Sequence, residues 1–271
     1  MDEKIKLLQK NGYVEFRNFW SIDEINKMKK EIDIVKSDQY LLGEGRSVNY
    51  CENGEINSIQ GLTPNKKCYF TDIGKSKKVY DLCKLLLNDD VELRNCELFL
   101  KPSKVGKSAP NHQDNAMWCL KKGIGLTIWT PLNNSSEENG GLYYYKGSHL
   151  NGCYEHENSY QVGTSQKIKN NNILNNFEKV IFNLKPGDMV VHLINTIHGS
   201  SKNTSNYPRQ VFTIQIYGKL DEVDSKKKKE YLINLKKQLI SRGQELNDGN
   251  LLNNHEASDG FKLKEKVFVE L

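Results

Sequence analysis

Two short stretches limit what this chain can fold into. The first is His112-Gln113-Asp114, and the second covers residues 185–200 and contains His198. Both stretches read as strands, and side chains two positions apart on a strand point to the same face. We therefore expect the His112 and Asp114 side chains to lie together, with His198 brought to the same point by a distant strand.

Two imidazoles and one carboxylate on one side of a metal ion form the ligand set of non-haem Fe(II) oxygenases. A single His-x-Asp match is a weak signal, because most such side chains are solvated. Arg209 strengthens it, since it lies 11 residues after His198 at the start of the apolar run 211–217. Arginine holds a carboxylate through two parallel hydrogen bonds. The pattern therefore predicts an oxygenase that uses Fe(II), 2-oxoglutarate and O2.

Other histidines compete for places at the site. His149 and His156 are rivals for the third ligand position. We favour His198, because it follows a strong strand and it alone has an arginine downstream at a workable spacing. His192, on the preceding strand, is either a hydrogen-bond donor to a ligand or a satisfied core histidine, and we favour the core interpretation.

The chain resembles the phytanoyl-CoA dioxygenase family, a branch of the Fe(II)/2-oxoglutarate dioxygenases, over residues 10–218. The motifs that carry the resemblance are His112-Gln113-Asp114, Glu138-Asn139-Gly140-Gly141-Leu142, Lys146-Gly147-Ser148-His149, Pro186-Gly187-Asp188 and His198-x-Ser200 followed by Arg209. The resemblance implies that His112, Asp114 and His198 bind iron. It also implies that Trp129, Ser200 and Arg209 line the 2-oxoglutarate site. An aspartate at position 114, in place of Gly or Ala, argues against the related halogenases.

The resemblance implies hydroxylation of an aliphatic C–H bond of a small molecule, with release of succinate and CO2. It does not name the substrate, because a fold and a triad do not choose among substrates. Residues 40–73 hold many turn residues and few periodic runs, so the pattern assigns them no regular element. In the family the equivalent region often covers the active-site mouth. Gln60 and Leu62 are therefore candidate pocket residues, although an ordinary surface loop is an equal alternative.

Further residues are candidates for substrate contacts. Asn115 and Trp118 follow the first motif, and a core role for Trp118 is an equal alternative. Lys101 and the pair Lys121-Lys122 are placed to meet an anionic substrate, but solvated lysines are commoner. No feature of the sequence decides between these interpretations.

The order of elements predicts a mainly β fold with flanking α-helices, a double-stranded β-helix or cupin-like jelly roll. A capping box at Ser21–Glu24 opens an amphipathic helix, and Ser76 opens a second. Short strands separated by Gly, Asn and Pro turns follow. We expect one domain over residues 1–218, with residues 151–176 as an insertion over the barrel mouth. Residues 219–271 are expected to form a charged helical extension that packs on the same domain.

Composition excludes several other classes. The 271 residues contain no apolar run long enough for a membrane span, and the six cysteines include no C-x-x-C pair, which fits reduced thiols in the cytoplasm. The net charge is +5, but the lysine run 226–229 lies in a tail of 11 basic and 10 acidic side chains. Such a run is usually a solvated face. We expect a cytoplasmic monomer or homodimer that binds a small molecule and neither nucleic acid nor a membrane.

Three alternatives belong to other classes. One is a cupin-like metal-binding protein, an isomerase with Zn or Mn or a binding module, without oxygenase activity; Arg209 speaks against it. Another is a sugar-binding or scaffolding jelly roll in which the triad is coincidental. The third is a nucleic-acid demethylating oxygenase, which would need a basic stripe that this sequence lacks. Joint binding of Fe(II) and 2-oxoglutarate separates the main hypothesis from the first two.

Overall fold

The computed structural model describes residues 1–37, 47–62, 68–161 and 163–241. Strands of the larger sheet are β1 (Tyr13–Phe16), β2 (Ser47–Tyr50), β3 (Ile56–Gln60), β4 (Val91–Phe99), β6 (Gly125–Pro131), β11 (Met189–Leu193) and β13 (Val211–Gly218). Strands of the smaller sheet are β5 (Ala109–His112), β7 (Leu142–Tyr145), β10 (Lys179–Ile181) and β12 (His198–Ser200). A separate hairpin joins β8 (His156–Gln161) and β9 (Thr164–Ile168). The helices are α1 (Asp2–Asn11), α2 (Ile22–Ser37), α4 (Tyr69–Gly74), α5 (Lys77–Leu87), α6 (Asn115–Trp118) and α7 (Ser225–Ser241), with 3-10 turns η1 (Ser148–Asn151) and η2 (Asn171–Asn176).

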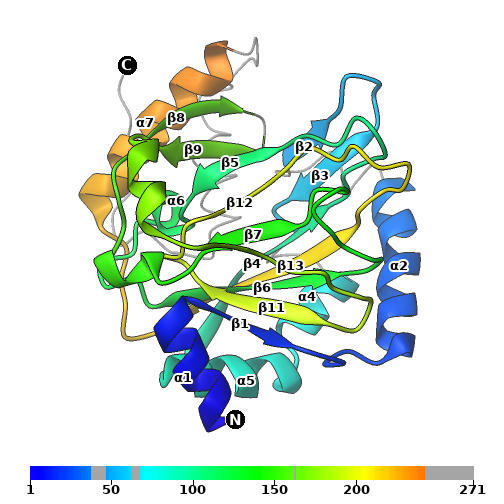
Figure 1. The fold of residues 1–271 in the computed structure, drawn as a ribbon, viewed down its shortest axis with the longest axis horizontal. Coiled ribbons are helices and arrows are strands. Elements are labelled where there is room, and N and C mark those ends of the chain that lie inside the picture. The colour runs from blue at the N-terminus through cyan, green and yellow to red at the C-terminus, as the bar shows by residue number, and fades with distance from the viewer. Residues whose placement is uncertain (38–46, 63–67, 162, 242–271) are drawn as a thin grey trace.

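Two antiparallel sheets make up the body of the molecule (Figure 1). The larger has the order β1-β11-β6-β13-β4-β3-β2 and the smaller the order β10-β7-β12-β5. A buried cluster joins the two sheets, with Tyr144 of β7 packed among Trp129, Val190 and Val211 of the larger sheet. This arrangement is the jelly roll that the sequence predicted.

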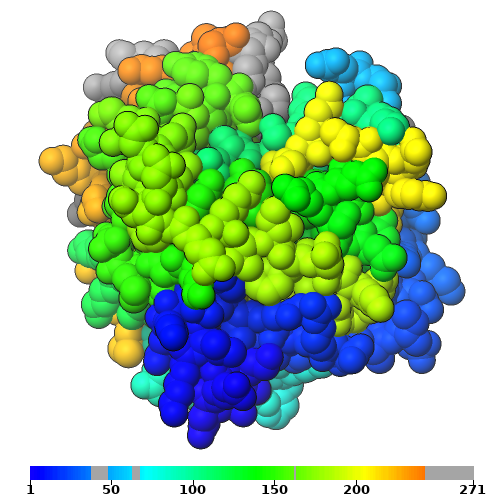
Figure 2. Space-filling view, in the orientation of Figure 1, coloured from blue at the N-terminus to red at the C-terminus, as the bar shows by residue number. Residues whose placement is uncertain are grey.

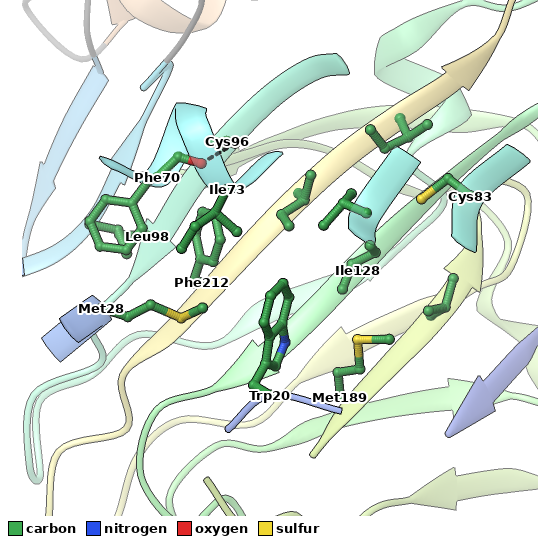
Figure 3. Packing of buried hydrophobic residues seen from close by; sticks show 14 of the residues in the cluster. Trp20, Met28, Phe70, Ile73, Cys83, Cys96, Leu98, Ile128, Met189 and Phe212 are labelled. Atoms are coloured by element: carbon green, nitrogen blue, oxygen red, sulfur yellow. Dashed lines mark hydrogen bonds between the residues drawn. The ribbon is translucent and has the colours of Figure 1, made fainter. Parts of the chain in front are cut away.

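The main hydrophobic core lies on the outer face of the larger sheet, under the helices (Figure 3). Alternation along each strand sends Ile128 and Phe212 to this face, where Met28 of α2 and Phe70 of α4 meet them. The Phe70 and Phe212 rings lie 4.8 Å apart. Because the helix-covered face takes most of the apolar side chains, the inner face of the sheet is free to carry polar residues.

The start of α2 follows the predicted capping box. The Ser21 amide donates to Glu24 Oε2 at 2.7 Å, and the Glu24 amide donates to Ser21 Oγ at 3.2 Å. We expect Ser21→Ala to lower the free energy of unfolding by about 1 kcal/mol, because the Glu24 amide loses its acceptor. Urea denaturation measures this, with Ser37→Ala as the control, since that hydroxyl only bonds Ile34 O at the exposed end of the same helix. Equal stability of the wild type and Ser21→Ala would contradict the capping role.

Residues 40–73 are more regular than the sequence predicted. The described part contains the β2–β3 hairpin and α4. In this hairpin β3 pairs with β4, and β2 forms the edge of the larger sheet. Asn53-Gly54 makes the turn, with Gly54 at φ +83°, and Asn-Gly is a strong hairpin signal. Leu62 is fully buried in the helix-side core, so this candidate lies neither in a surface loop nor on the polar inner face of the sheet.

The insertion and the C-terminal extension also take regular forms. Residues 151–176 contain the β8–β9 hairpin, which lies against β5 and α7 (Figure 1). Tyr231, Leu232 and Leu235 of α7 pack on Cys119, so the described part of the extension contacts the main body. Figure 2 shows α1 (blue) at one end of the molecule and α7 (orange) at the other. Residues 242–271 of the expected extension lie outside the described residues.

None of the helices that the structure describes is both long and apolar enough to cross a bilayer.

Candidate metal and 2-oxoglutarate site

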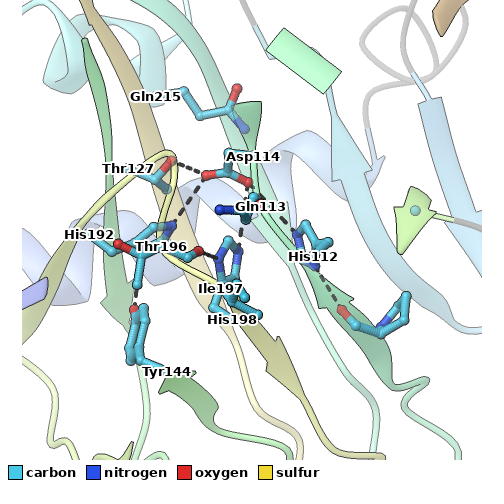
Figure 4. Close-up of polar contacts among 12 residues, drawn as sticks. His112, Gln113, Asp114, Thr127, Tyr144, His192, Thr196, Ile197, His198 and Gln215 are labelled. Carbon is cyan, nitrogen blue, oxygen red and sulfur yellow. Dashed lines mark hydrogen bonds and ion pairs between the residues drawn. The ribbon is translucent and has the colours of Figure 1, made fainter. Parts of the chain in front are cut away.

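Three buried side chains converge between the sheets at the end of β5 (Figure 4). His112 is the last residue of β5 and His198 the first of β12, and these two residues are paired directly across the smaller sheet. Their rings lie 4.2 Å apart. With Asp114, they offer three ligand atoms that lie within 4.8 Å of one another, which is close enough for a single metal ion to contact all three.

The reason for the convergence of His112 and Asp114 differs from the predicted one. We expected both side chains on one face of a strand, but β5 ends at His112. Asp114 has helical angles, φ −56° and ψ −36°, and is the N-cap residue of α6. The turn into α6 therefore places the Asp114 carboxylate beside the His112 imidazole. The alternation of side chains along a strand is not the cause.

Backbone carbonyls determine which ring nitrogen carries the proton in His112 and His198. His112 Nδ1 lies 2.8 Å from Pro110 O, and His198 Nδ1 lies 2.9 Å from Thr196 O. A carbonyl only accepts, so Nδ1 carries the proton in each ring and Nε2 keeps a lone pair. Burial lowers the pKa of both imidazoles, most strongly that of His198. The Nε2 atoms lie 3.8 and 3.7 Å from Asp114 Oδ1, so two neutral donors and one carboxylate oxygen face one another.

The other oxygen of Asp114 is held by the chain itself. Thr127 Oγ1 donates to Asp114 Oδ2 at 2.7 Å, and His192 Nε2 lies 3.2 Å from the same atom. Tyr144 OH lies 3.2 Å from His192 Nδ1. Burial raises the pKa of Asp114, but the surrounding imidazoles outweigh this effect and hold the pKa below its usual range. His192 therefore bonds a candidate ligand, which supports the donor alternative that the sequence left open and not the core interpretation that we favoured.

The rival histidines lie outside the triad. His149 Nε2 bonds Gln9 O in α1, far along the chain from β5. Both ring nitrogens of His156 contact backbone groups. Nε2 accepts from the Gln113 backbone N–H at 3.1 Å, and Nδ1 lies 2.8 Å from Tyr154 O. The structure thus brings His198, and neither of its rivals, to His112 and Asp114.

Arg209 is a buried cation with two nitrogens that lack partners. Only 2% of the residue is exposed, and among the described residues its Nε and Nη1 have no hydrogen-bond partner. Its guanidinium carbon lies 5.5 Å from the centre of the Trp129 ring. Burial lowers its pKa to about 9, so it remains charged at neutral pH. A buried charge is costly unless paired, and this one fits an anionic ligand such as the far carboxylate of 2-oxoglutarate.

Ser200 and Lys101 stand beside this arginine. Lys101 Nζ donates to Ser200 Oγ at 2.7 Å and to Ser201 O at 2.6 Å, and Lys101 O accepts from the Arg209 amide. Burial lowers the pKa of Lys101 well below its usual range, and nearby Arg209 adds to this. The sequence left Lys101 open between contact with an anionic substrate and a solvated position. In the structure Lys101 is buried and bonds Ser200, and contact with a substrate stays a prediction. The predicted residues Trp129, Ser200 and Arg209 therefore gather around one region, with Lys101 added.

Comparison with known proteins matches this arrangement to a family. The family model for phytanoyl-CoA dioxygenase (PhyH) covers residues 8–211. The chain belongs to the phytanoyl-CoA dioxygenase family. Membership confirms the predicted enzyme class, a dioxygenase that uses iron, 2-oxoglutarate and O2.

Relatives of this dioxygenase act on different small molecules. The probable alpha-ketoglutarate-dependent hypophosphite dioxygenase of Stutzerimonas stutzeri is 26% identical over 211 residues, 75% of this chain and 73% of the relative. The ectoine dioxygenase of Stutzerimonas stutzeri strain A1501 is 22% identical and covers 74% of this chain and 71% of its own. A crystal structure of EctD from S. alaskensis with 2-oxoglutarate and 5-hydroxyectoine has a TM-score of 0.69 at 19% identity, over 83% of this chain and 78% of that one. This likeness confirms the jelly-roll fold.

The three residues predicted to contact the substrate, Gln60, Asn115 and Trp118, each contact other parts of the chain. Gln60 Nε2 donates to Gly163 O at 3.1 Å at the end of β3. The amide of Asn115 bonds both the N–H and the C=O of Leu120, which fixes the turn after α6. Trp118 is buried, with the Arg94 guanidinium carbon 4.6 Å from its ring. Substrate contact by Gln60, Asn115 and Trp118 stays a prediction.

The lysine pair Lys121-Lys122 has partners near the start of the C-terminal extension. Lys121 Nζ donates to Glu222 Oε1 and Lys122 Nζ donates to Leu220 O, each at 2.7 Å. These contacts are exposed, and the ordinary surface role that the sequence left open accounts for them. Contact with an anionic substrate stays a prediction.

The polar inner face of β4 and β13 was not foreseen from the sequence. Glu97 lies opposite Thr213, and Asn95 lies opposite Gln215. All four are buried, and Gln215 lies opposite Thr127, which bonds Asp114 (Figure 4). The available signal was the alternation of polar Asn95 and Glu97 with apolar neighbours along β4, which marks a strand with one polar face.

Glu97 on this polar face makes the stability of the folded protein depend on pH. Burial raises its pKa to about 7; the Asp114 charge adds to this, while Arg94 and hydrogen bonds from Gln60 and Gln215 lower it. Because the folded-state pKa lies above the ordinary value of 4.5, the folded protein binds this proton more tightly. The resulting stabilisation is complete below about pH 4.5 and is lost as the pH rises through about 7.

We expect Glu97→Gln to stabilise the metal-free protein at about pH 8, by on the order of 3 kcal/mol. The amide keeps the shape of the side chain and removes the buried charge. At about pH 5 the two proteins should be nearly equal in stability. Denaturation at both pH values measures the difference, with Glu92→Gln on the exposed end of the same strand as the control. A gain of equal size at both pH values would show that ionisation of Glu97 is not its cause.

Proposed function

We propose that this dioxygenase binds Fe(II) through His112, Asp114 and His198 and 2-oxoglutarate through Arg209. The observation that carries the proposal is the pairing of a compact metal-ligand cluster with a buried guanidinium. Two nitrogens of this guanidinium have no hydrogen-bond partner in the part of the chain that the structure describes. A cupin-like metal protein that does not bind 2-oxoglutarate would have no anionic ligand to offset the buried charge of Arg209. The donor set of two neutral imidazoles and one carboxylate suits Fe(II) and leaves room for other ligands.

When bound, iron and 2-oxoglutarate supply the oxidative chemistry, which yields succinate, CO2 and a hydroxylated aliphatic C–H bond in the substrate. The chain contributes orientation and charge. His192 and Thr127 hold one oxygen of Asp114 and leave the other to face the imidazoles. Pro110 O and Thr196 O fix the tautomers of His112 and His198, which keeps their Nε2 atoms ready as donors.

The opposite end of the site is arranged to bind an anion. Ser200 lies two residues after His198 on β12, and Lys101 Nζ donates to its hydroxyl oxygen. The Ser200 proton is then available to a carboxylate that Arg209 holds. Trp129 forms a wall beside the guanidinium. These roles for Arg209, Ser200 and Trp129 agree with those that the resemblance implied.

The substrate is proposed to be a small molecule, as the names of the hypophosphite and ectoine dioxygenases indicate for two relatives. A buried polar inner face suits a small polar compound better than a long acyl chain. The six cysteines are all free thiols, which supports the proposed cytoplasmic location. A monomer or homodimer stays a prediction.

An anaerobic titration tests the proposal. Metal-free protein receives Fe(II) and then 2-oxoglutarate, and the visible metal-to-ligand charge-transfer band of the chelate is recorded. The band should form in the wild type and be lost in His198→Ala, while His149→Ala should retain it. Iron binding without a band would favour the cupin-like alternative, and binding of neither would favour a non-catalytic jelly roll. Once the band is seen, succinate release identifies substrates, starting with hypophosphite and ectoine.

A further inference from the structure

A strip of polar side chains lines the inner face of the larger sheet beside the candidate metal site. The strip crosses four neighbouring strands of the sheet, and its members all lie on the face away from the helix-side core. All are buried except the half-buried Gln60. They are Ser58 and Gln60 of β3, Asn95 and Glu97 of β4, Thr213 and Gln215 of β13, and Thr127 of β6. Thr127 bonds the Asp114 carboxylate, so one end of the strip touches the metal-ligand cluster.

Glu97 is the carboxylate within this strip, and neutral amides surround it. Asn95 Nδ2 donates to Glu97 Oε1 at 3.1 Å, and the amides of Gln60 and Gln215 also hydrogen-bond to it. Arg94 is the nearby cation, and it donates to Gln215 Oε1 at 2.6 Å. Its charge lowers the pKa of Glu97 by less than burial raises it, so that the pKa stays at about 7. Arg94 therefore offsets only part of the cost of ionising Glu97.

Burying an ionised carboxylate is unfavourable unless positive charge offsets it. Only 8% of Glu97 is exposed, and an apolar or amide residue would cost less at this position if Glu97 had only a packing role. Its place in the strip that reaches Asp114 suggests that further positive charge arrives with the substrate. Because the neighbouring amides both donate and accept, they can orient a planar nitrogen group beside the carboxylate.

We propose that Glu97 binds a positively charged nitrogen of the substrate, which would make the substrate a small amine, amidine or zwitterion. This inference rests on the proposed function, since it concerns the substrate of that same site. In the free protein a proton takes the place of the cation, in agreement with the raised pKa of Glu97. Binding of the cation then releases that proton to solvent near neutral pH.

The test compares two probes of nearly equal shape, acetamidinium and acetamide. Methyl proton line broadening in NMR spectra gives the dissociation constant of each, on anaerobic protein loaded with Fe(II) and 2-oxoglutarate and on metal-free protein. The wild type should bind acetamidinium about 10-fold more tightly than acetamide, through a charge-assisted hydrogen bond. Glu97→Gln should bind both about equally, and the control Glu92→Gln should keep the wild-type preference.

Equal affinity of the wild type for both probes would overturn the proposal, as would an undiminished preference in Glu97→Gln. A protonated Glu97 that serves only as a hydrogen-bond donor would give the opposite result, with acetamide preferred. Failure of the proposed function appears separately, as the absence of the charge-transfer band in the wild type. Retention of that band by Glu97→Gln shows that the variant is folded, so that a lost preference reports on Glu97 alone.

Discussion

Asp114→Ala should lose Fe(II) on desalting under conditions in which the wild type keeps it. We expect the iron dissociation constant to rise by more than about 100-fold, because loss of a mere hydrogen-bond partner of a ligand already lowers affinity roughly 10- to 100-fold. Asp114 supplies the negative charge of the triad, and removing it leaves two imidazoles as ligands. Iron content by metal analysis and succinate release with an identified substrate measure the two consequences.

The control for this variant is His149→Ala, since His149 contacts Gln9 O and not the triad. It should retain iron and activity. A second variant, Asp114→Asn, separates charge from shape, because it keeps an oxygen near the imidazoles while the charge is lost. Full iron retention by Asp114→Ala, with circular dichroism like that of the wild type, would show that the metal lies elsewhere.

Arg209→Ala should weaken 2-oxoglutarate binding by about 100-fold or more while iron binding changes little. Truncating one member of a buried charge pair typically costs about 2–5 kcal/mol. Beside Trp129, two nitrogens of Arg209 find no hydrogen-bond partner within the described ranges. Titration of the charge-transfer band against 2-oxoglutarate measures the effect. Because no charged partner offsets the burial of this cation among the described residues, the variant should lose little stability before 2-oxoglutarate is added.

Two further variants sharpen the Arg209 experiment. Arg209→Lys keeps a charge but loses the planar fork, so its affinity should lie between those of the wild type and Arg209→Ala. Arg17→Ala, which removes a half-exposed arginine paired with Asp188, should bind 2-oxoglutarate like the wild type. Normal 2-oxoglutarate affinity in Arg209→Ala would mean that another group anchors the carboxylate.

The stability gain expected of Glu97→Gln and the substrate role proposed for Glu97 are connected. A residue that destabilises the free protein and is nevertheless buried beside the metal site is typical of a functional group. The same carboxylate that weakens the fold above neutral pH would, in our proposal, provide the attraction for a cationic substrate.

Local signals determined much of the fold. The capping box at Ser21 and the cap at Ser76 fixed the starts of α2 and α5, because those hydrogen bonds join residues three apart. The apolar run 211–217, which became β13, was also visible, since burial imposes a pattern on each strand separately. The Asn53-Gly54 turn carried an equally local signal for the β2–β3 hairpin, although the sequence pattern assigned residues 40–73 no regular element.

From the sequence, the site could be predicted only as a set of residue types. The sequence named four of these residues because two histidines, one aspartate and a downstream arginine match the ligand and cosubstrate needs of a 2-oxoglutarate oxygenase. They are His112, Asp114, His198 and Arg209, and the family resemblance supported the choice. What only the tertiary structure decided was how they meet: the turn at Asp114, the pairing of His112 with His198 across two strands, the support that His192 gives Asp114, and the polar face that holds Glu97. Those features depend on register and on contacts between segments distant in the chain, and periodicity within one segment carries no information about its partner.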